Sequence, residues 1–389
     1  MASPIFLLMI LFHLLLATEL VSCVGIPLTR ASRKTWPKYT STNSVNNNPP
    51  ASPGKSPMKF SNDIYTMSLA IGTPPKPFSA IMDTGSNLIW TKCKSSGSGL
   101  YDTSMSTSFS NHIDDSCEEL GLGQKCQQKY DDGKVSVSVT LGQETLTIED
   151  QKYNNVTFGC GKPNDKNFNC GGIVGMGPGK SSLVSHLEKR VFSYCLSPTA
   201  SNVWLTGSEA NIRDTNIQTT PLVTDDLYYY ISLEGISVGE TKLPLTKSDF
   251  PSSYEYAGGM IIDSGTAFTY LEQRIIDMIS DEFMNQTKLE KCKDNVTPYG
   301  HVLEHCFKYQ GNNVHFPNLI FHFEGANWEL PRENYIYEKK GVNEGCLAFL
   351  ANENTEKVSI FGNMQQQNMM VTYDLEKKSL SIFKPANCN

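Results

Sequence analysis

The sequence predicts a mainly β protein in which two similar lobes form one site. Residues 65–71 and 135–141 alternate between apolar and polar side chains, which is the period of half-buried strands. The tetrapeptide Asp83-Thr84-Gly85-Ser86 returns nearly unchanged as Asp263-Ser264-Gly265-Thr266, and each copy follows an apolar run. Helical spacing of apolar side chains is found at 182–190 and 271–286. The 389 residues are enough for two packed cores.

The repeat extends over about half of the chain. Residues 65–69 resemble residues 230–233, and each segment precedes one tetrapeptide. Downstream of each tetrapeptide, two apolar residues are followed by a glycine, Gly175 in one half and Gly362 in the other. This pattern indicates a strand that passes so close to another loop that a side chain on the glycine would collide with it.

The beginning of the chain is typical of an exported protein. An apolar stretch at 4–17 is followed by small residues, so residues 1–24 are expected to form a signal peptide. The stretch is too short for a good membrane anchor, and a buried amino-terminal helix is the alternative. Residues 25–60 lack apolar periodicity and are expected to form a leader, followed by an N-terminal lobe at 61–220 and a C-terminal lobe at 221–389.

Charge is divided unevenly along the chain. The leader carries six basic residues and no acidic one, whereas residues 61–389 carry 27 basic and 39 acidic residues. An acidic body disfavours nucleic acid as a partner. The basic leader either covers a carboxylate-lined cleft until the carboxylates are protonated, or is an ordinary disordered terminus; its composition favours neither.

Cysteines and glycosylation sequons agree with export. Ten cysteines follow Cys23, and this even number suggests five disulfides whose connectivity the sequence leaves open. His301 and His305 have i, i+4 spacing beside Cys306, so a zinc site is the less favoured alternative. Three sequons mark acceptor positions for N-glycosylation, at Asn155, Asn285 and Asn295.

The repeated tetrapeptide carries the chemistry. Asp83 and Asp263, at the centre of a twofold arrangement, are expected within hydrogen-bond reach of each other, and two charges that close cannot both form easily. The pair therefore holds one proton over a wide pH range. The carboxylate can take a proton from water while the carboxylic acid donates to a carbonyl oxygen, without a covalent intermediate. Gly85 and Gly265 let the backbone approach each carboxyl group.

The hydroxyl residues of the two motifs are expected to hold the aspartates in place. Ser86 and Thr266 can donate to the outer carboxylate oxygens and fix their rotamers. Thr84 and Ser264 can bond across the interface and join the lobes. No metal is expected, because a metal needs more ligands than two aspartates and neither motif contains a histidine or a further carboxylate.

With these motifs the chain resembles the pepsin-type (A1) aspartic endopeptidases, and in detail the plant nepenthesin-like subfamily, over about residues 63–388. The resemblance implies a bilobal pepsin-like acid protease fold, with a central cleft for an extended peptide or unfolded protein. It also implies pepstatin-like inhibitors, no metal or cofactor, an acidic pH optimum, and cleavage between bulky apolar residues. The motifs that carry it are Ile71-Gly72-Thr73-Pro74-Pro75, Asp83-Thr84-Gly85-Ser86-Asn87-Leu88-Ile89-Trp90, Phe158-Gly159-Cys160-Gly161, Phe192-Ser193-Tyr194-Cys195-Leu196, Asp263-Ser264-Gly265-Thr266 and Gly362-Asn363-Met364-Gln365-Gln366-Gln367-Asn368.

Residue roles are carried over by position. Asp83 and Asp263 match the catalytic pair, and the resemblance implies a disulfide between Cys306 and Cys346. Residues implied to lie around the substrate are Trp90, Tyr130, Gly85, Ser86, Gly265 and Thr266.

The flap, a hairpin that covers the substrate in this family, departs from the family pattern. Trp90 matches the tryptophan that holds the flap tyrosine, and the best match for that tyrosine is Tyr130. Asp131 stands where the family has a glycine, and Lys134 begins a segment where a Ser/Thr-then-Gly pattern is expected.

Two functions agree with the sequence. The first is an active acid endopeptidase, and the second is a catalytically weak or silent binder or inhibitor on the same fold. Proteins of this fold that lack catalytic activity usually have lost an aspartate or have a disrupted Asp-x-Gly motif. Both motifs are intact here, so we favour the enzyme. We expect a monomer, made as a zymogen and secreted to the extracellular space, with no partner membrane; the vacuole is the alternative compartment.

Overall fold

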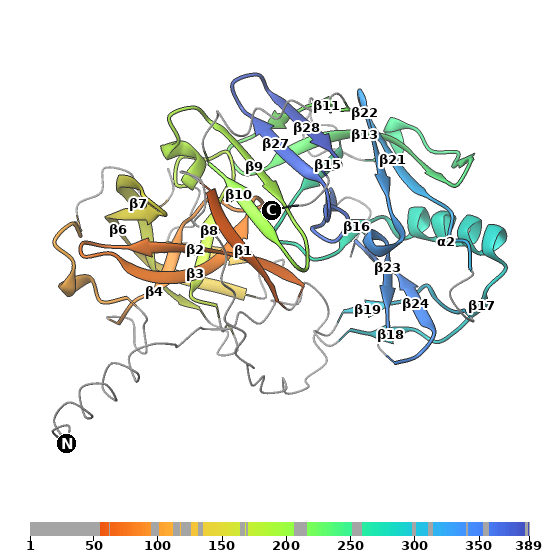
Figure 1. Ribbon diagram of the computed structural model, residues 1–389, viewed down its shortest axis with the longest axis horizontal. Coiled ribbons are helices and arrows are strands. Elements are labelled where there is room, and N and C mark those ends of the chain that lie inside the picture. Colours follow the sequence, from red (N-terminus) through yellow and green to blue (C-terminus); the bar gives the residue numbers. More distant parts are fainter. Residues whose placement is uncertain are drawn as a thin grey trace, which may run out of the picture.

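The protein is mainly β, as the sequence predicted. The structure, a computed structural model, describes residues 55–61, 63–94, 101–111, 117, 126–130, 135–163, 168, 170–205, 216–250, 259–297, 301–309, 314–339, 341–352, 358–385 and 388. The signal peptide and residues 25–54 of the leader lie outside these residues. Figure 1 shows two groups of strands, with helix α2 (Gln273–Thr287) on the outer side of the second group.

One large sheet runs through the first lobe and on to the boundary between the lobes. In the described residues it has 13 strands. In spatial order they are β11 (Gln218–Pro221), β28 (Ser379–Phe383), β27 (Met370–Asp374), β9 (Val191–Cys195), β10 (Ser201–Trp204), β1 (Lys55–Ser61), β2 (Ile64–Ile71), β3 (Lys76–Asp83), β8 (Gly172–Gly175), β4 (Trp90–Lys92), β7 (Gln151–Pro163), β6 (Val135–Ile148) and β5 (Gln127–Tyr130).

The described part of the second lobe contains three smaller sheets. The largest has the order β22 (Ala326–Leu330), β21 (Leu319–Phe323), β13 (Tyr229–Val238), β15 (Gly259–Ile262), β26 (Ser359–Phe361), β16 (Thr269–Leu271) and β25 (Phe349–Ala351), with β12 (Val223–Thr224) and β14 (Thr241–Lys242) beside β13. A second has the order β17 (Glu290–Lys291), β20 (Cys306–Lys308), β24 (Glu344–Leu347) and β23 (Ile336–Glu338), and a third pairs β18 (Asn295–Val296) with β19 (Val302–Leu303). The described 3-10 helices are η2 (Thr103–Met105), η4 (Leu183–His186), η5 (Lys247–Asp249) and η6 (Arg332–Asn334).

The internal repeat corresponds to a repeat in strand pairing. β3 lies parallel to β8, and β15 lies parallel to β26. β4 is antiparallel to β8, as β16 is to β26. The glycines that follow the apolar pairs are tightly enclosed, because a methyl group on Gly175 would overlap the backbone of Asn87, and one on Gly362 would overlap the backbone of Phe268. The close approach predicted from the sequence is therefore present in both halves.

The two helical predictions have different outcomes. α2 buries Ile275, Ile279 and Phe283 on one face, as their spacing predicted. The segment 182–190 forms only the short 3-10 helix η4, where Leu183 and Val184 are buried. A run this short gains little from helix propagation, so packing decides its backbone.

Strands from both halves of the chain share the sheet at the junction. β27 and β28, near residue 380, pair with β9 and β11 rather than with strands of the second lobe. The boundary expected at 220/221 falls inside β11, and the leader boundary expected at 60 falls inside β1. These differences arise because strand pairing joins segments far apart in sequence. Cys195 and Cys388 form a disulfide across the same region.

Aromatic side chains fill the junction. Phe192 stacks on Tyr373 with ring centroids 4.5 Å apart. The hydroxyl of Tyr194 lies 3.1 Å from that of Tyr373, and Tyr229 donates to the carbonyl of Met176 at 2.8 Å. Such close contacts between rings add to the stability gained from their burial.

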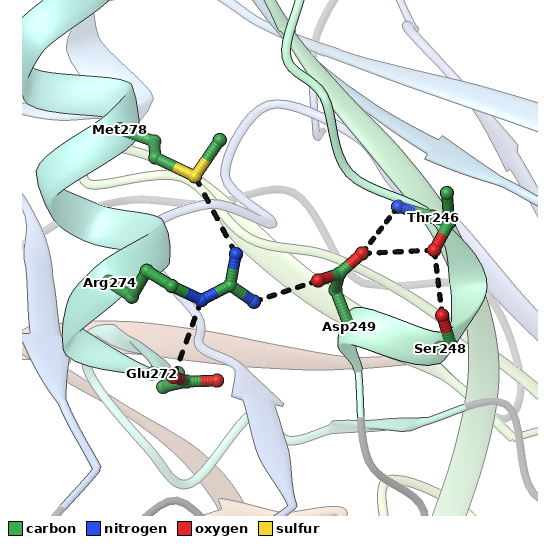
Figure 2. A network of polar contacts seen from close by, with 6 residues as sticks. All are labelled: Thr246, Ser248, Asp249, Glu272, Arg274 and Met278. Carbon is green, nitrogen blue, oxygen red and sulfur yellow. Dashed lines mark hydrogen bonds and ion pairs between the residues drawn. The ribbon is translucent and has the colours of Figure 1, made fainter.

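Arg274 ties the beginning of α2 to the turn at η5 (Figure 2). Its guanidinium donates to Asp249 at 2.8 Å and lies 3.5 Å from Glu272. Hydrogen bonds from Thr246 and from Arg274 lower the pKa of Asp249. Because Arg274 is half exposed, we expect this network to orient the helix more than to stabilise it.

Candidate active site

The two aspartates face each other where the parallel strand pairs end. Asp83 is the last residue of β3, and Asp263 directly follows β15. A methyl group on Gly85 would lie 2.5 Å from Oδ2 of Asp263, and one on Gly265 would overlap Oδ1 of Asp83. Each glycine therefore leaves room for the carboxyl group of the other half.

Each carboxyl group is held by the same two donors of its own motif. The amide of Gly85 donates to Asp83 Oδ1 at 2.9 Å, and Ser86 Oγ donates to Oδ2 at 2.5 Å. In the second motif, the amide of Gly265 donates to Asp263 Oδ1 at 2.7 Å, and Thr266 Oγ1 donates to Oδ2 at 2.5 Å. This matched arrangement fixes both rotamers before any ligand arrives.

The hydroxyls of Thr84 and Ser264 join the two motifs. Ser264 Oγ accepts from the amide of Thr84 at 3.1 Å and donates to the carbonyl of Met82 at 2.9 Å. Reciprocally, Thr84 Oγ1 accepts from the amide of Ser264 at 2.9 Å and donates to the carbonyl of Ile262 at 3.3 Å. Both side chains are fully buried. Four interlobe hydrogen bonds thus set the distance between the aspartates.

The electrostatics favour a shared proton. Burial raises the pKa of Asp83 well above its ordinary value, and the negative charge of Asp263 raises it further. The hydrogen bonds from Ser86 and Gly85 act in the opposite direction but do not cancel the rise. One proton is therefore retained between the two carboxyl groups over a wide range of pH.

Tyr130 lies close to the first motif, because Asp83 and Ser86 both affect its pKa. Trp90 Nε1 donates to its hydroxyl at 2.8 Å, and Trp90 is fully buried. Burial raises the pKa of Tyr130, and the charge of Asp83 adds to that rise, so the phenol stays protonated. The altered flap positions Asp131 and Lys134 lie outside the described residues.

Buried amides brace the second motif, a role that no sequence argument assigned to them. Asn363 donates to the carbonyl of Ser264 at 3.2 Å, and Gln366 donates to the carbonyl of Asp263 at 3.1 Å. Gln365 accepts from the amide of Thr269 at 3.0 Å. The polar run 362–368 was part of the resemblance, and its density of amides beside an apolar strand was the only signal of burial.

The cysteines are mostly paired in disulfides, which bears on the alternative of a zinc site. Cys306 is bonded to Cys346, so its thiolate is not free to bind zinc with His301. In the part of the chain that the structure describes, no group of three or more His, Cys, Asp or Glu could hold a metal ion. Other disulfides join Cys93 to Cys160 and Cys117 to Cys126, whereas Cys292 is free, which departs from full pairing of the ten cysteines.

The sequons differ in accessibility. Asn155 and Asn285 are exposed and Asn295 is partly buried. Their glycosylation stays a prediction. The described helices include none that is long and apolar enough to cross a membrane.

Comparison with known proteins gives consistent relatives. The family models "Xylanase inhibitor N-terminal" and "Xylanase inhibitor C-terminal" match residues 65–208 and 228–384. Aspartic proteinase nepenthesin-1 of Nepenthes gracilis is 38% identical over 350 residues, covering 83% of this chain and 78% of its own length. Nepenthesin-2 of the same plant is 35% identical over 358 residues, covering 86% and 80%. The crystal structure of basic 7S globulin from soybean has a TM-score of 0.65 at 18% identity, covering 86% of this chain and 97% of that one, which shows the shared fold.

Proposed function

The chain belongs to the pepsin-type aspartic proteinases of the plant nepenthesin-like subfamily, and we propose that it is an active endopeptidase that hydrolyses peptide bonds at acidic pH. The observation that carries the proposal is the matched pair of Asp83 and Asp263, each held by an amide and a hydroxyl of its own motif. A binding protein would not need two carboxyl groups positioned to share one proton.

The mechanism follows from the shared proton. A water between Asp83 and Asp263 loses a proton to the ionised carboxylate as its oxygen attacks the peptide carbonyl carbon. The protonated carboxyl group donates to the carbonyl oxygen, so no charged oxyanion has to form. The dyad of the aspartic proteases is itself the reference example of such a pair.

The surroundings of Tyr130 support a preference for bulky apolar residues at the scissile bond. Tyr130 packs against a buried apolar cluster that includes Ile64, Ile81 and Trp90. Its hydroxyl is held by Trp90, so the ring has a fixed place near enough to Asp83 to feel its charge. We propose that the hairpin of β5 and β6, in which Tyr130 ends β5, covers an extended peptide and excludes water from the reaction.

A weak or silent binder remains the second candidate. It is favoured by the names of the two matching family models, which describe xylanase inhibitors. The intact dyad favours the enzyme.

We also propose, from the apolar stretch at 4–17, that the chain is secreted as a monomeric zymogen.

The decisive experiment compares the wild type with Asp83→Asn. Both chains are expressed from residue 25, acidified, and mixed with a denatured protein at a pH of about 3–5. We expect digestion by the wild type, inhibition of it by pepstatin, and a loss of at least about a hundredfold in the variant. Equal digestion by both chains, or none by either, would contradict the enzyme and favour the binder.

A further inference from the structure

Three cysteines lie side by side in the second lobe, two on neighbouring strands and one, Cys292, directly after a third strand. Cys306 in β20 is directly opposite Cys346 in β24, and the two are bonded. On the other side of β20, Lys291 pairs with Phe307, so the next residue, Cys292, comes opposite Cys306. The amide of Cys292 donates to the carbonyl of Cys306 at 2.9 Å, which confirms this register.

Their positions make Cys306 a neighbour of two sulfurs. Residues directly opposite in an antiparallel pair point to the same face, with Cβ atoms about 4.5–5.5 Å apart. Cys292 packs against the apolar cluster that contains Cys306 and Cys346, and its thiol is free. The row therefore places a free thiol on one side of Cys306 and its bonded partner on the other.

The surroundings favour this thiol over any thiol in solution. Cys306 is 4% exposed and Cys346 is 1% exposed, so an external reductant cannot easily approach the bond. Cys292 is only partly buried, so it can exchange its proton with solvent, and it already packs against the cluster that encloses the bond. In a displacement at sulfur, the attacking and leaving sulfurs lie on opposite sides of the sulfur under attack. Cys292 and Cys346 lie on opposite sides of Cys306 in this way.

We propose that Cys292 is an exchange partner of the Cys306–Cys346 disulfide. The Cys292 thiol first gives its proton to solvent. Its thiolate then attacks Sγ of Cys306, a Cys292–Cys306 bond forms, and the Cys306–Cys346 bond breaks. Cys346 leaves as a thiolate and takes up a proton, so the step is balanced and needs no oxidant or reductant.

Acidity holds the native pairing in place. Burial raises the pKa of the Cys292 thiol. Below that pKa the thiolate fraction, and with it the exchange rate, rises about tenfold for each unit of pH. The charged groups around the thiol are of both signs and come from three strands and the turn after β23: Glu290, Lys308, Glu344 and Lys339. The bond is therefore fixed under acidic conditions and becomes mobile as the pH rises.

The exchange would reach the candidate active site through β24. The residue after this strand, Ala348, accepts from the side chain of Gln365 at 3.1 Å. Gln365 also binds Thr269, on the strand that follows the second motif. Freeing β24 from β20 removes a covalent restraint on this connection. Which two of these three cysteines are bonded thus depends on the pH at which the protein has been kept, and through β24 this choice affects the second lobe.

The test maps disulfides in the wild-type full chain. The protein is held at pH about 4, 7 or 8, quenched with acid, alkylated with N-ethylmaleimide, and digested for mass spectrometry. We expect the label on Cys292 at acidic pH. At higher pH we expect label on Cys346 and a Cys292–Cys306 peptide, appearing about tenfold faster per pH unit and at a rate independent of protein concentration.

Two variants sharpen the result. Folded in a buffer of oxidised and reduced glutathione, which supplies the oxidant, Cys346→Ser is expected to form the Cys292–Cys306 bond. Cys292→Ser should keep Cys306–Cys346 and show no label on either residue at any pH. Label confined to Cys292 in the wild type at every pH and time would overturn the proposal. The wild-type arm decides the matter if Cys346→Ser fails to fold, and no arm depends on proteolytic activity.

Discussion

Removing one hydroxyl between the lobes should destabilise the protein strongly. In Ser264→Ala, the amide of Thr84 loses its acceptor and the carbonyl of Met82 loses a donor. Both groups stay buried, because Ser264 and its neighbours are fully enclosed. An unsatisfied buried polar group costs about 1–3 kcal/mol, so two of them should lower the free energy of unfolding by about 2–6 kcal/mol.

The assay is urea unfolding followed by tryptophan fluorescence. With a slope of about 2 kcal/mol per molar urea, the loss corresponds to a midpoint lower by about 1 M or more. The matched control is Ser68→Ala, an exposed serine in β2, which should change the midpoint little. Equal midpoints for the two variants would refute the idea that these interlobe hydrogen bonds hold the aspartates together.

Three other changes test the site and its surroundings. Gly265→Ala places a methyl group against Asp83 Oδ1, so kcat/KM at acidic pH should fall by at least about a hundredfold. The circular dichroism spectrum should stay unchanged, and near-normal activity would contradict the close approach of Gly265 to Asp83. Tyr130→Phe leaves Trp90 Nε1 without its acceptor and should lower kcat/KM about tenfold, whereas an unchanged value would remove Tyr130 from the site. Burial raises the pKa of Asp63 to about 6, so the folded state binds the proton more tightly than the unfolded state and loses stability as pH rises from about 4 to 6. Asp63→Asn should therefore be more stable than the wild type at pH 7, by about 3 kcal/mol, and similar to it at pH 4; the same difference at both pH values would exclude the titration.

The features that the sequence predicted well are carried by short segments. The alternation in 65–71, the apolar runs before Asp83 and Asp263, and the spacing on α2 each depend on neighbours in the chain. A strand buries every second side chain and a helix buries those three or four residues apart, so these patterns can be recognised in the sequence before the fold is known. The repeat then predicted the pairing of the two aspartates, because two similar halves meet at a common axis.

The features that were missed depend on contacts between distant residues. β27 pairs with β9 across the lobes, and nothing in the local pattern of either strand specifies that partner. The burial of Gln365 has only a weak local signal, the density of amides in 362–368, because the groups that satisfy its side chain are backbone groups of residues remote in sequence. The position of Cys292 beside Cys306 required the register of β17 on β20, because a shift of one residue would turn the thiol to the other face.

The shared sheet at the junction also bears on how the protein is made. β9 lies between β10 and β27, and the disulfide that closes this region joins residues 193 positions apart. At about 5–20 residues per second, a ribosome needs about 10–40 s to supply the missing partner. Throughout that time the first lobe presents the unpaired edge of β9, which is a template for aggregation. The risk of aggregation therefore lasts through the translation of the second half of the chain. A translational pause in that half should reduce the yield of folded protein more than a pause in the first half.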